Sequence, residues 1–236
     1  MNNNAVVWIL THEYFDEVKR SADSAKEYFP DADRILLTPD KYEGNHFTQV
    51  VKTNPRLHKH WYLDEVHYFT QLHSLPYDKL IFLDSDMLLV GDCSELWALL
   101  DKFDLAMAHA PTRETKPPIH PVPQAFTEFC TGIVAFRNSE KIKWLFKDWY
   151  ANYLKDAEGF GNNDQVPLRE TLWNTDLNIR LATLPIEYNC RFGLGGHAIR
   201  PVKILHGRYG GSMDVVNAIV NKTIHPRVWA MGSFPV

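Results

Sequence analysis

Continuous apolar runs and helically spaced apolar residues alternate along the chain. The runs at 5–10, 34–38, 79–83, 104–108 and 131–136 are typical of strands buried on both faces of a parallel sheet. Between several of these runs, apolar residues recur every three or four positions, which is the spacing of an amphipathic helix. The alternation of the two patterns predicts an α/β fold with a doubly wound sheet.

Four helices follow from the second pattern. One is expected from His12 to Phe29, where Pro30 ends it, and another from about Trp61 to Leu75, which Pro76 stops. The third has its buried stripe between Ile142 and Tyr153, and a short fourth helix begins near Asp164. The polar stretch 39–55 carries neither pattern, and further strands are expected near 182–184 and 202–205.

Composition limits the classes of function. With 236 residues, 45% of them hydrophobic, the chain is long enough to bury a core, and we expect one domain at 1–236, with its core at about 5–211 and a C-terminal tail at 212–236. Lys and Arg total 25 against 29 for Asp and Glu, with both signs scattered along the chain. This balance offers no basic face for phosphates, so we expect no nucleic-acid partner.

Targeting signals and cysteine spacing give expectations about the compartment. No apolar run approaches the roughly 20 residues that cross a bilayer, and the first residues lack the pattern of a signal peptide. We therefore expect no transmembrane segment and a cytoplasmic protein. Cys93, Cys130 and Cys190 have no metal-ligand spacing, and their odd count fits free thiols in a reducing compartment.

Two carboxylates follow one apolar strand directly. Asp84 and Asp86 come after the run that ends at Leu83, and at strand spacing both side chains can point the same way. Ligands of open α/β sheets bind beyond the carboxyl ends of the strands, where adjacent carboxylates repel unless a cation holds them together. The alternative is a solvated strand end in which Asp86 turns the chain, because Asp-x-Asp tripeptides are common.

A histidine ends a second strand far away in the sequence. His206 follows Lys203-Ile204-Leu205, and its imidazole would complete a mixed oxygen and nitrogen ligand set with Asp84 and Asp86. Such a set favours Mn²⁺, allows Mg²⁺, and disfavours Ca²⁺ or a structural zinc. The alternative is an ordinary half-buried histidine.

Four segments in order resemble a known family. Leu72–Asp86 contains the Asp-x-Asp, Phe129–Asn138 contains Thr-Gly, Asn163–Gln165 contains Asp-Gln, and His206 is followed by Gly207. Together they resemble GT-A glycosyltransferases of the glycogenin-like, family 8 type. The resemblance implies a single GT-A domain with a Rossmann-like, mostly parallel sheet and helices on both faces. It also implies an enzyme that transfers a sugar from a nucleotide-diphosphate donor with Mn²⁺ or Mg²⁺, and retains the anomeric configuration.

The resemblance also assigns residues to roles. Asp84 would meet the metal and the ribose, with Asp86 and His206 as the other metal ligands. Asp164 and Gln165 would act at the reacting sugar. The remaining donor-binding candidates are Thr11 at the base, Ser85, Thr131 and Gly132 along the donor, and Arg208, or alternatively Lys222, at the diphosphate.

Several of these residues have simpler interpretations. Thr11 and Asp164 each fit a helix N-cap, Gln165 fits a solvated helix position, and Gly132 fits a plain strand glycine. The sequence also departs from the family pattern. Cys130 stands where the family has an asparagine, and Glu65 falls near the place of a family lysine.

The expected partners are a UDP- or GDP-sugar donor and a carbohydrate, glycoprotein or small-molecule acceptor. The proline-rich loop 111–123 and the aromatic tail around Trp229 and Phe234 are candidate acceptor walls, because long loops commonly carry binding. One alternative function is an aspartate-dependent phosphohydrolase, although its Asp-x-Asp usually follows the first strand and precedes a threonine. The other is a non-catalytic protein that binds nucleotide sugars or glycans.

Overall fold

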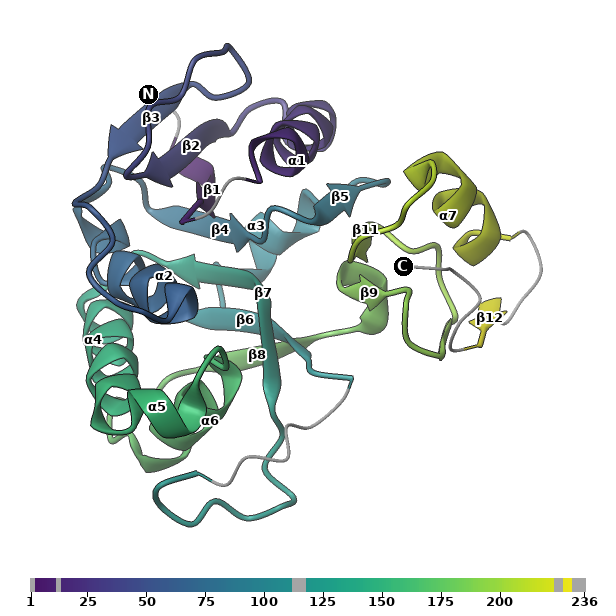
Figure 1. The fold of residues 1–236 in the computed structure, drawn as a ribbon. Helices are drawn as coiled ribbons and strands as arrows, with labels where there is room; N and C mark the ends of the chain where they lie inside the picture. The colour runs from purple at the N-terminus through teal and green to yellow at the C-terminus, as the bar shows by residue number, and fades with distance from the viewer. Residues whose placement is uncertain (1–2, 12–13, 112–117, 223–226, 231–236) are drawn as a thin grey trace.

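The computed structural model describes residues 3–11, 14–111, 118–222 and 227–230. Its main element is a seven-stranded sheet with the spatial order β3-β2-β1-β4-β7-β6-β8 (Figure 1). Neighbouring strands are parallel except around β7, which is antiparallel to both β4 and β6, so the predicted mostly parallel α/β sheet is confirmed. The strands are β1 (Asn4–Ile9), β2 (Asp33–Thr38), β3 (Gln49–Lys52), β4 (Lys79–Leu83), β6 (Leu105–His109), β7 (Phe129–Arg137) and β8 (Leu181–Leu184).

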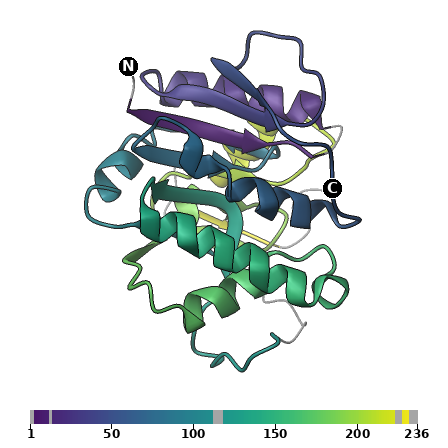
Figure 2. The ribbon, with the colours of Figure 1, turned by 90° about the vertical axis from the view of Figure 1, so that its left-hand side faces the viewer.

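Helices cover both faces of this sheet (Figures 1 and 2). Successive residues of β1 point to opposite faces, so that Val6 and Trp8 join one hydrophobic cluster while Val7 and Ile9 join another. The first cluster contains α1 (Phe15–Tyr28) and α3 (Glu95–Leu99). The second contains α2 (Trp61–Phe69), α4 (Glu140–Lys155), α5 (Ala157–Phe160) and α6 (Gln165–Asn174).

A smaller unit lies beside the carboxyl ends of the main strands (Figure 1). Its sheet has the order β5-β11-β9, and a two-stranded ribbon, β10-β12, and helix α7 accompany it. Residues from this unit form a third hydrophobic cluster that includes Leu205, Val216 and Trp229, so residues after 211 pack here. Its elements are β5 (Met87–Leu89), β9 (Cys190–Arg191), β10 (Gly196–Ala198), β11 (Ile204–His206), α7 (Met213–Val220) and β12 (Arg227–Trp229).

The structure differs from the predicted elements in several places. Helix α1 begins at Phe15 rather than His12, and the sequence did not predict α3, α7 or the strands β5, β9, β10 and β12. Two further differences have a local explanation. The helix expected to reach Leu75 ends at Phe69 and is followed by a short 3₁₀ turn, Leu72–Ser74. The Thr70 hydroxyl bonds the His67 carbonyl at 2.6 Å, which is a local alternative to helix continuation. Strand β3 lies in the polar stretch 39–55, where the sequence predicted no element. A partly exposed edge strand needs little apolar patterning, so its sequence did not mark it.

The described cysteines and helices bear on two further expectations. All three cysteines are free and buried. Within the described ranges, none of the helices combines the length and the apolar composition that crossing a membrane requires.

Candidate metal centre and donor cavity

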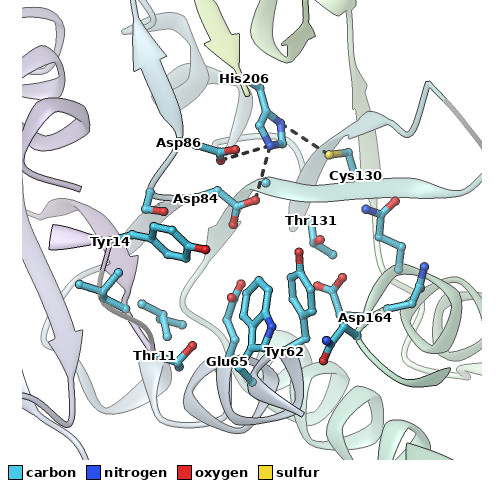
Figure 3. A pocket seen from close by; sticks show the side chains of 18 of the residues that line it. Thr11, Tyr14, Tyr62, Glu65, Asp84, Asp86, Cys130, Thr131, Asp164 and His206 are labelled. Atoms are coloured by element: carbon cyan, nitrogen blue, oxygen red, sulfur yellow. Dashed lines mark hydrogen bonds and ion pairs between the residues drawn. The ribbon is translucent and has the colours of Figure 1, made fainter. Parts of the chain in front are cut away.

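A cavity of about 260 Å³ opens at the carboxyl ends of β1 and β4. It receives side chains from both faces of the main sheet and from the smaller unit (Figure 3). The cavity brings together every residue that the sequence predicted for the site: Thr11, Asp84, Ser85, Asp86, Thr131, Gly132, Asp164, Gln165, His206 and Arg208 all line it. Lys222, the alternative to Arg208, does not line it.

Strand pairing places the three predicted metal ligands together. The chain leaves β4 at Asp84 and enters β5 at Met87, which pairs with His206 of β11 in antiparallel register. His206 Nε2 lies 3.6 Å from Asp84 Oδ2 and 3.5 Å from Asp86 Oδ1. One ligand atom of each residue lies within 4.8 Å of the others, which is a spacing that a single cation can bridge.

A hydrogen bond at Nδ1 fixes the tautomer of His206 and leaves Nε2 facing the carboxylates. Nδ1 lies 2.6 Å from Asn189 Oδ1, an oxygen that can only accept, so Nδ1 carries the proton and Nε2 presents its lone pair. Burial lowers the pKa of His206 to about 4, and the ring is therefore neutral near pH 7. His206 is almost fully enclosed rather than half-buried.

This arrangement fits a divalent metal. A neutral imidazole lone pair that faces two carboxylates is unfavourable unless a cation lies between them, and burial together with Asp86 raises the pKa of Asp84 well above its usual range. Two carboxylate oxygens and one nitrogen form a ligand set for a divalent cation that leaves positions open.

Gly132 has a steric role next to this group. A Cβ at Gly132 would collide with the His206 ring, and the Gly132 carbonyl accepts a hydrogen bond of 2.9 Å from the Asp84 amide. The absence of a side chain at Gly132 therefore allows His206 to approach Asp84. Gly132 thus has a steric role that a strand glycine without such a neighbour would not have.

Arg208 is held at the rim of the cavity by other side chains. Its Nε and Nη2 donate to the two oxygens of Glu17 at 2.8 and 2.9 Å, and its guanidinium lies 4.5 Å from the centre of the Tyr14 ring. Nη1 lies 3.5 Å from Asp86 Oδ2. Ser85 Oγ also donates to Glu17, at 3.4 Å. Glu17 thus links two of the predicted donor-binding residues.

Asp164 has an unsatisfied carboxylate oxygen in the cavity. The residue occupies the N-cap position of α6, but its side chain makes no capping bond; Asn163 Oδ1 accepts from the Val166 amide instead, at 3.0 Å. Asp164 Oδ2 is buried without a hydrogen-bond partner. Burial raises the pKa of Asp164 to about 6, although a hydrogen bond from Thr131 lowers it. The capping interpretation is therefore wrong for the Asp164 side chain.

Thr11 is not a helix cap either. It is buried at the end of β1 and lines the cavity, whereas the N-cap position of α1 belongs to Tyr14.

Sequence reasoning missed Asn189 and Arg191. They lie in and next to the two-residue strand β9, which has no periodic pattern, and they reach the site only through the pairing of β9 with β11. Tyr62 and Glu65 of α2 also line the cavity (Figure 3). The sequence predicted this helix and placed Glu65 near the position of a family lysine, but it assigned neither side chain to the site.

Comparison with known proteins identifies the fold. Neither a protein-family model nor a curated protein sequence matches the chain. Two solved structures of the glycosyltransferase GlyE from Streptococcus pneumoniae TIGR4, one of them the apo form, match it with TM-scores of 0.61 and 0.60 at 16% and 18% sequence identity. The matches cover 88% and 87% of this chain but 55% and 54% of the GlyE chains, so this chain spans about half of their length. At these identities the likeness establishes the fold, a mixed α/β architecture consistent with a GT-A-like domain.

Proposed function

We propose that this protein is a glycosyltransferase that moves a sugar from a UDP- or GDP-sugar to an acceptor, with a divalent cation, Mn²⁺ or Mg²⁺, in its donor site. The observation that carries the proposal is the cluster of Asp84, Asp86 and His206 at the carboxyl ends of the strands. The fold shared with the glycosyltransferase GlyE and the ordered family 8 motifs support the same function.

The residues of the cavity have distinct tasks in this reaction. Asp84, Asp86 and His206 would hold the cation, which would supply positive charge to offset the negative charge of the nucleotide diphosphate. Arg208 extends the positive charge at the same rim, where Glu17 fixes its orientation. Asp164 and Gln165, at the start of α6, orient the donor sugar, and the proposed outcome is retention of configuration.

A screen of nucleotide sugars tests the function directly. Purified protein is incubated with UDP- and GDP-sugars and a panel of sugar acceptors in Mn²⁺ or EDTA, and free UDP or GDP and the glycosylated product are measured. We expect release of one nucleotide diphosphate and formation of product in Mn²⁺ only. Equal rates in EDTA would contradict the metal assignment.

The same preparation separates the two alternative functions. Hydrolysis of p-nitrophenyl phosphate without release of nucleotide diphosphate would identify a phosphohydrolase. Mn²⁺-dependent binding of a nucleotide sugar without turnover of any donor would identify a non-catalytic binding protein.

A second cavity is our candidate for the acceptor site. It measures about 230 Å³, and Pro111 of the proline-rich loop and Trp229 of the C-terminal region both line it. Arg191 lines this cavity and the donor cavity, so the two adjoin. The Trp229 ring is held by a 2.6 Å bond from Nε1 to the Leu194 carbonyl and packs on Gly196. Residues 112–117 of the loop and Phe234 lie outside the described residues.

Filling this cavity is expected to separate transfer from donor hydrolysis. Ala110 lines this second cavity, and the indole of Ala110→Trp should displace the acceptor from its reactive position. Transfer to the acceptor should therefore fall by about tenfold or more. Hydrolysis of the donor by water should change less than about twofold, because the metal cluster is untouched. The matched control is Ala151→Trp on the exposed side of α4. An equal loss of both activities would place the second cavity in donor binding instead.

A further inference from the structure

Glu65 is a mostly buried residue whose carboxylate faces the donor cavity. It lies in α2, its residue is only 5% exposed, and its side chain is directed into the donor cavity beside Tyr62 (Figure 3). Among the described residues, no hydrogen-bond donor and no cation contacts its carboxylate. Its helix neighbour Asp64 accepts hydrogen bonds at Oδ1 from the amides of Leu57 and His58, at 3.0 and 3.1 Å, and its Oδ2 is buried without a partner. A mostly buried carboxylate normally accepts hydrogen bonds, and the described part of the chain supplies Glu65 with none, so its oxygens are left to face the cavity that the residue lines.

The negatively charged residues around Glu65 make its ionised form still less favourable. Burial and the nearby Asp84, Asp164 and Asp86 raise its pKa well above the usual range. Tyr62, one helical turn before Glu65, is a neutral neighbour, because burial and then the surrounding acids, Glu65 among them, raise the pKa of its hydroxyl. None of these neighbours is a cation that could offset the charge of Glu65. We call Glu65, Asp84, Asp86 and Asp164 the acidic wall of the cavity.

A bound donor would balance only part of this acidic wall. The cation of the proposed function offsets Asp84 and Asp86, and Arg208 is engaged by Glu17. Glu65 and the unpartnered Oδ2 of Asp164 then remain as two acceptors in one cavity. A diphosphate offers neither of them a hydrogen bond, because its oxygens are negatively charged acceptors. A sugar ring offers hydroxyl or ammonium donors.

We propose that Glu65, together with Asp164, selects the donor sugar: the pair accepts hydrogen bonds from hydroxyl or ammonium groups on the ring and excludes sugars that carry a carboxylate. This inference rests on the proposed function and extends it to the class of donor. Neutral and amino sugars are therefore substrates, and uronic acids are rejected, because a further carboxylate beside Glu65 and Asp164 would add negative charge to a dry site that already disfavours it.

Three donors that share one nucleotide test the selection. Binding of UDP-glucosamine, UDP-glucose and UDP-glucuronate is measured by calorimetry in Mn²⁺, with UDP as the reference that lacks the sugar. Wild-type protein is expected to bind UDP-glucuronate about tenfold or more weakly than UDP-glucose, and UDP-glucosamine at least as tightly as UDP-glucose. If the site takes guanosine instead, GDP-mannose and GDP-mannuronate form the equivalent pair.

Glu65→Gln isolates the charge while keeping the side-chain shape. The variant should narrow the difference between the glucose and glucuronate donors to about threefold or less and leave the affinity for UDP within about twofold. Glu140→Gln, on the exposed side of α4, is the matched control, and thermal melting checks that both variants fold.

Each contrary outcome has a defined meaning. Equal affinities for the neutral and uronic donors in the wild type overturn the inference and leave the proposed function intact. A parallel loss of UDP affinity in Glu65→Gln places Glu65 at the nucleotide and also overturns it. Absence of Mn²⁺-dependent binding of either nucleotide overturns the proposed function together with the inference.

Discussion

Asp86→Ala is expected to abolish Mn²⁺-dependent binding of the nucleotide diphosphate. The change removes one of the three proposed ligand side chains and also the carboxylate that lies 3.5 Å from Arg208 Nη1. Loss of a supporting residue outside the ligand set costs roughly 10- to 100-fold in metal affinity, and loss of a ligand should cost more. Calorimetric titration of UDP or GDP in Mn²⁺ and in EDTA measures the effect.

Asp78→Ala provides the matched control for this variant. Asp78 is an exposed aspartate next to the opposite end of the same strand, β4, and does not line the cavity. It should bind nucleotide as the wild type does. The metal assignment fails if Asp86→Ala retains wild-type affinity in Mn²⁺, or if wild-type binding is as tight in EDTA.

The sequence predicted the sheet well where strands are buried on both faces. β1 and β4 are continuous apolar runs whose alternate residues enter two different hydrophobic clusters, so their pattern is strong and local. β3 was not predicted, because this edge strand, Gln49–Lys52, has partly exposed side chains and shows neither a continuous apolar run nor an alternation of apolar and polar residues. The end of α2 was also misjudged, since the hydrogen bond from Thr70 to His67 competes with the helix without changing the apolar spacing.

The site was predictable to the extent that its residues end long strands or match ordered motifs. Asp84 and Asp86 follow β4 directly, and His206 ends β11. In both places a polar residue after an apolar run marked the site in the sequence. Asn189 and Arg191 were not predictable, because they contribute through the pairing of β9 with β11 and no local pattern marks them. The partner of Arg208, Glu17, lies 191 positions away in the first turn of α1, and such a distant contact leaves no trace in one sequence.

Asp164→Asn is expected to slow transfer by roughly 10²- to 10³-fold, the cost of losing a group that contacts the reacting atoms. The unpartnered Oδ2 in the donor cavity is the structural reason to place Asp164 there. The helix should not weaken, because the capping bond to the Val166 amide comes from Asn163. Steady-state kinetics with the donor found in the screen measure the rate.

The same substitution should stabilise the fold above pH 6. Burial raises the pKa of Asp164 from 3.8 to about 6, so between these values the folded state binds more protons than the unfolded state. The free energy of unfolding therefore falls as pH rises through this window, by roughly 3 kcal/mol once the group is ionised. Asp164→Asn removes this loss, so its melting temperature should rise relative to the wild type from pH 4 to pH 7.

Rate and stability should thus move in opposite directions in Asp164→Asn. Asp176→Asn is the matched control, because Asp176 is exposed just beyond the C-terminal end of α6 and should change neither quantity. A structural role for Asp164 would give the reverse result, with a melting temperature lowered at every pH and a turnover near that of the wild type. That outcome would remove Asp164 from the sugar site and leave Glu65 as the buried carboxylate facing the donor.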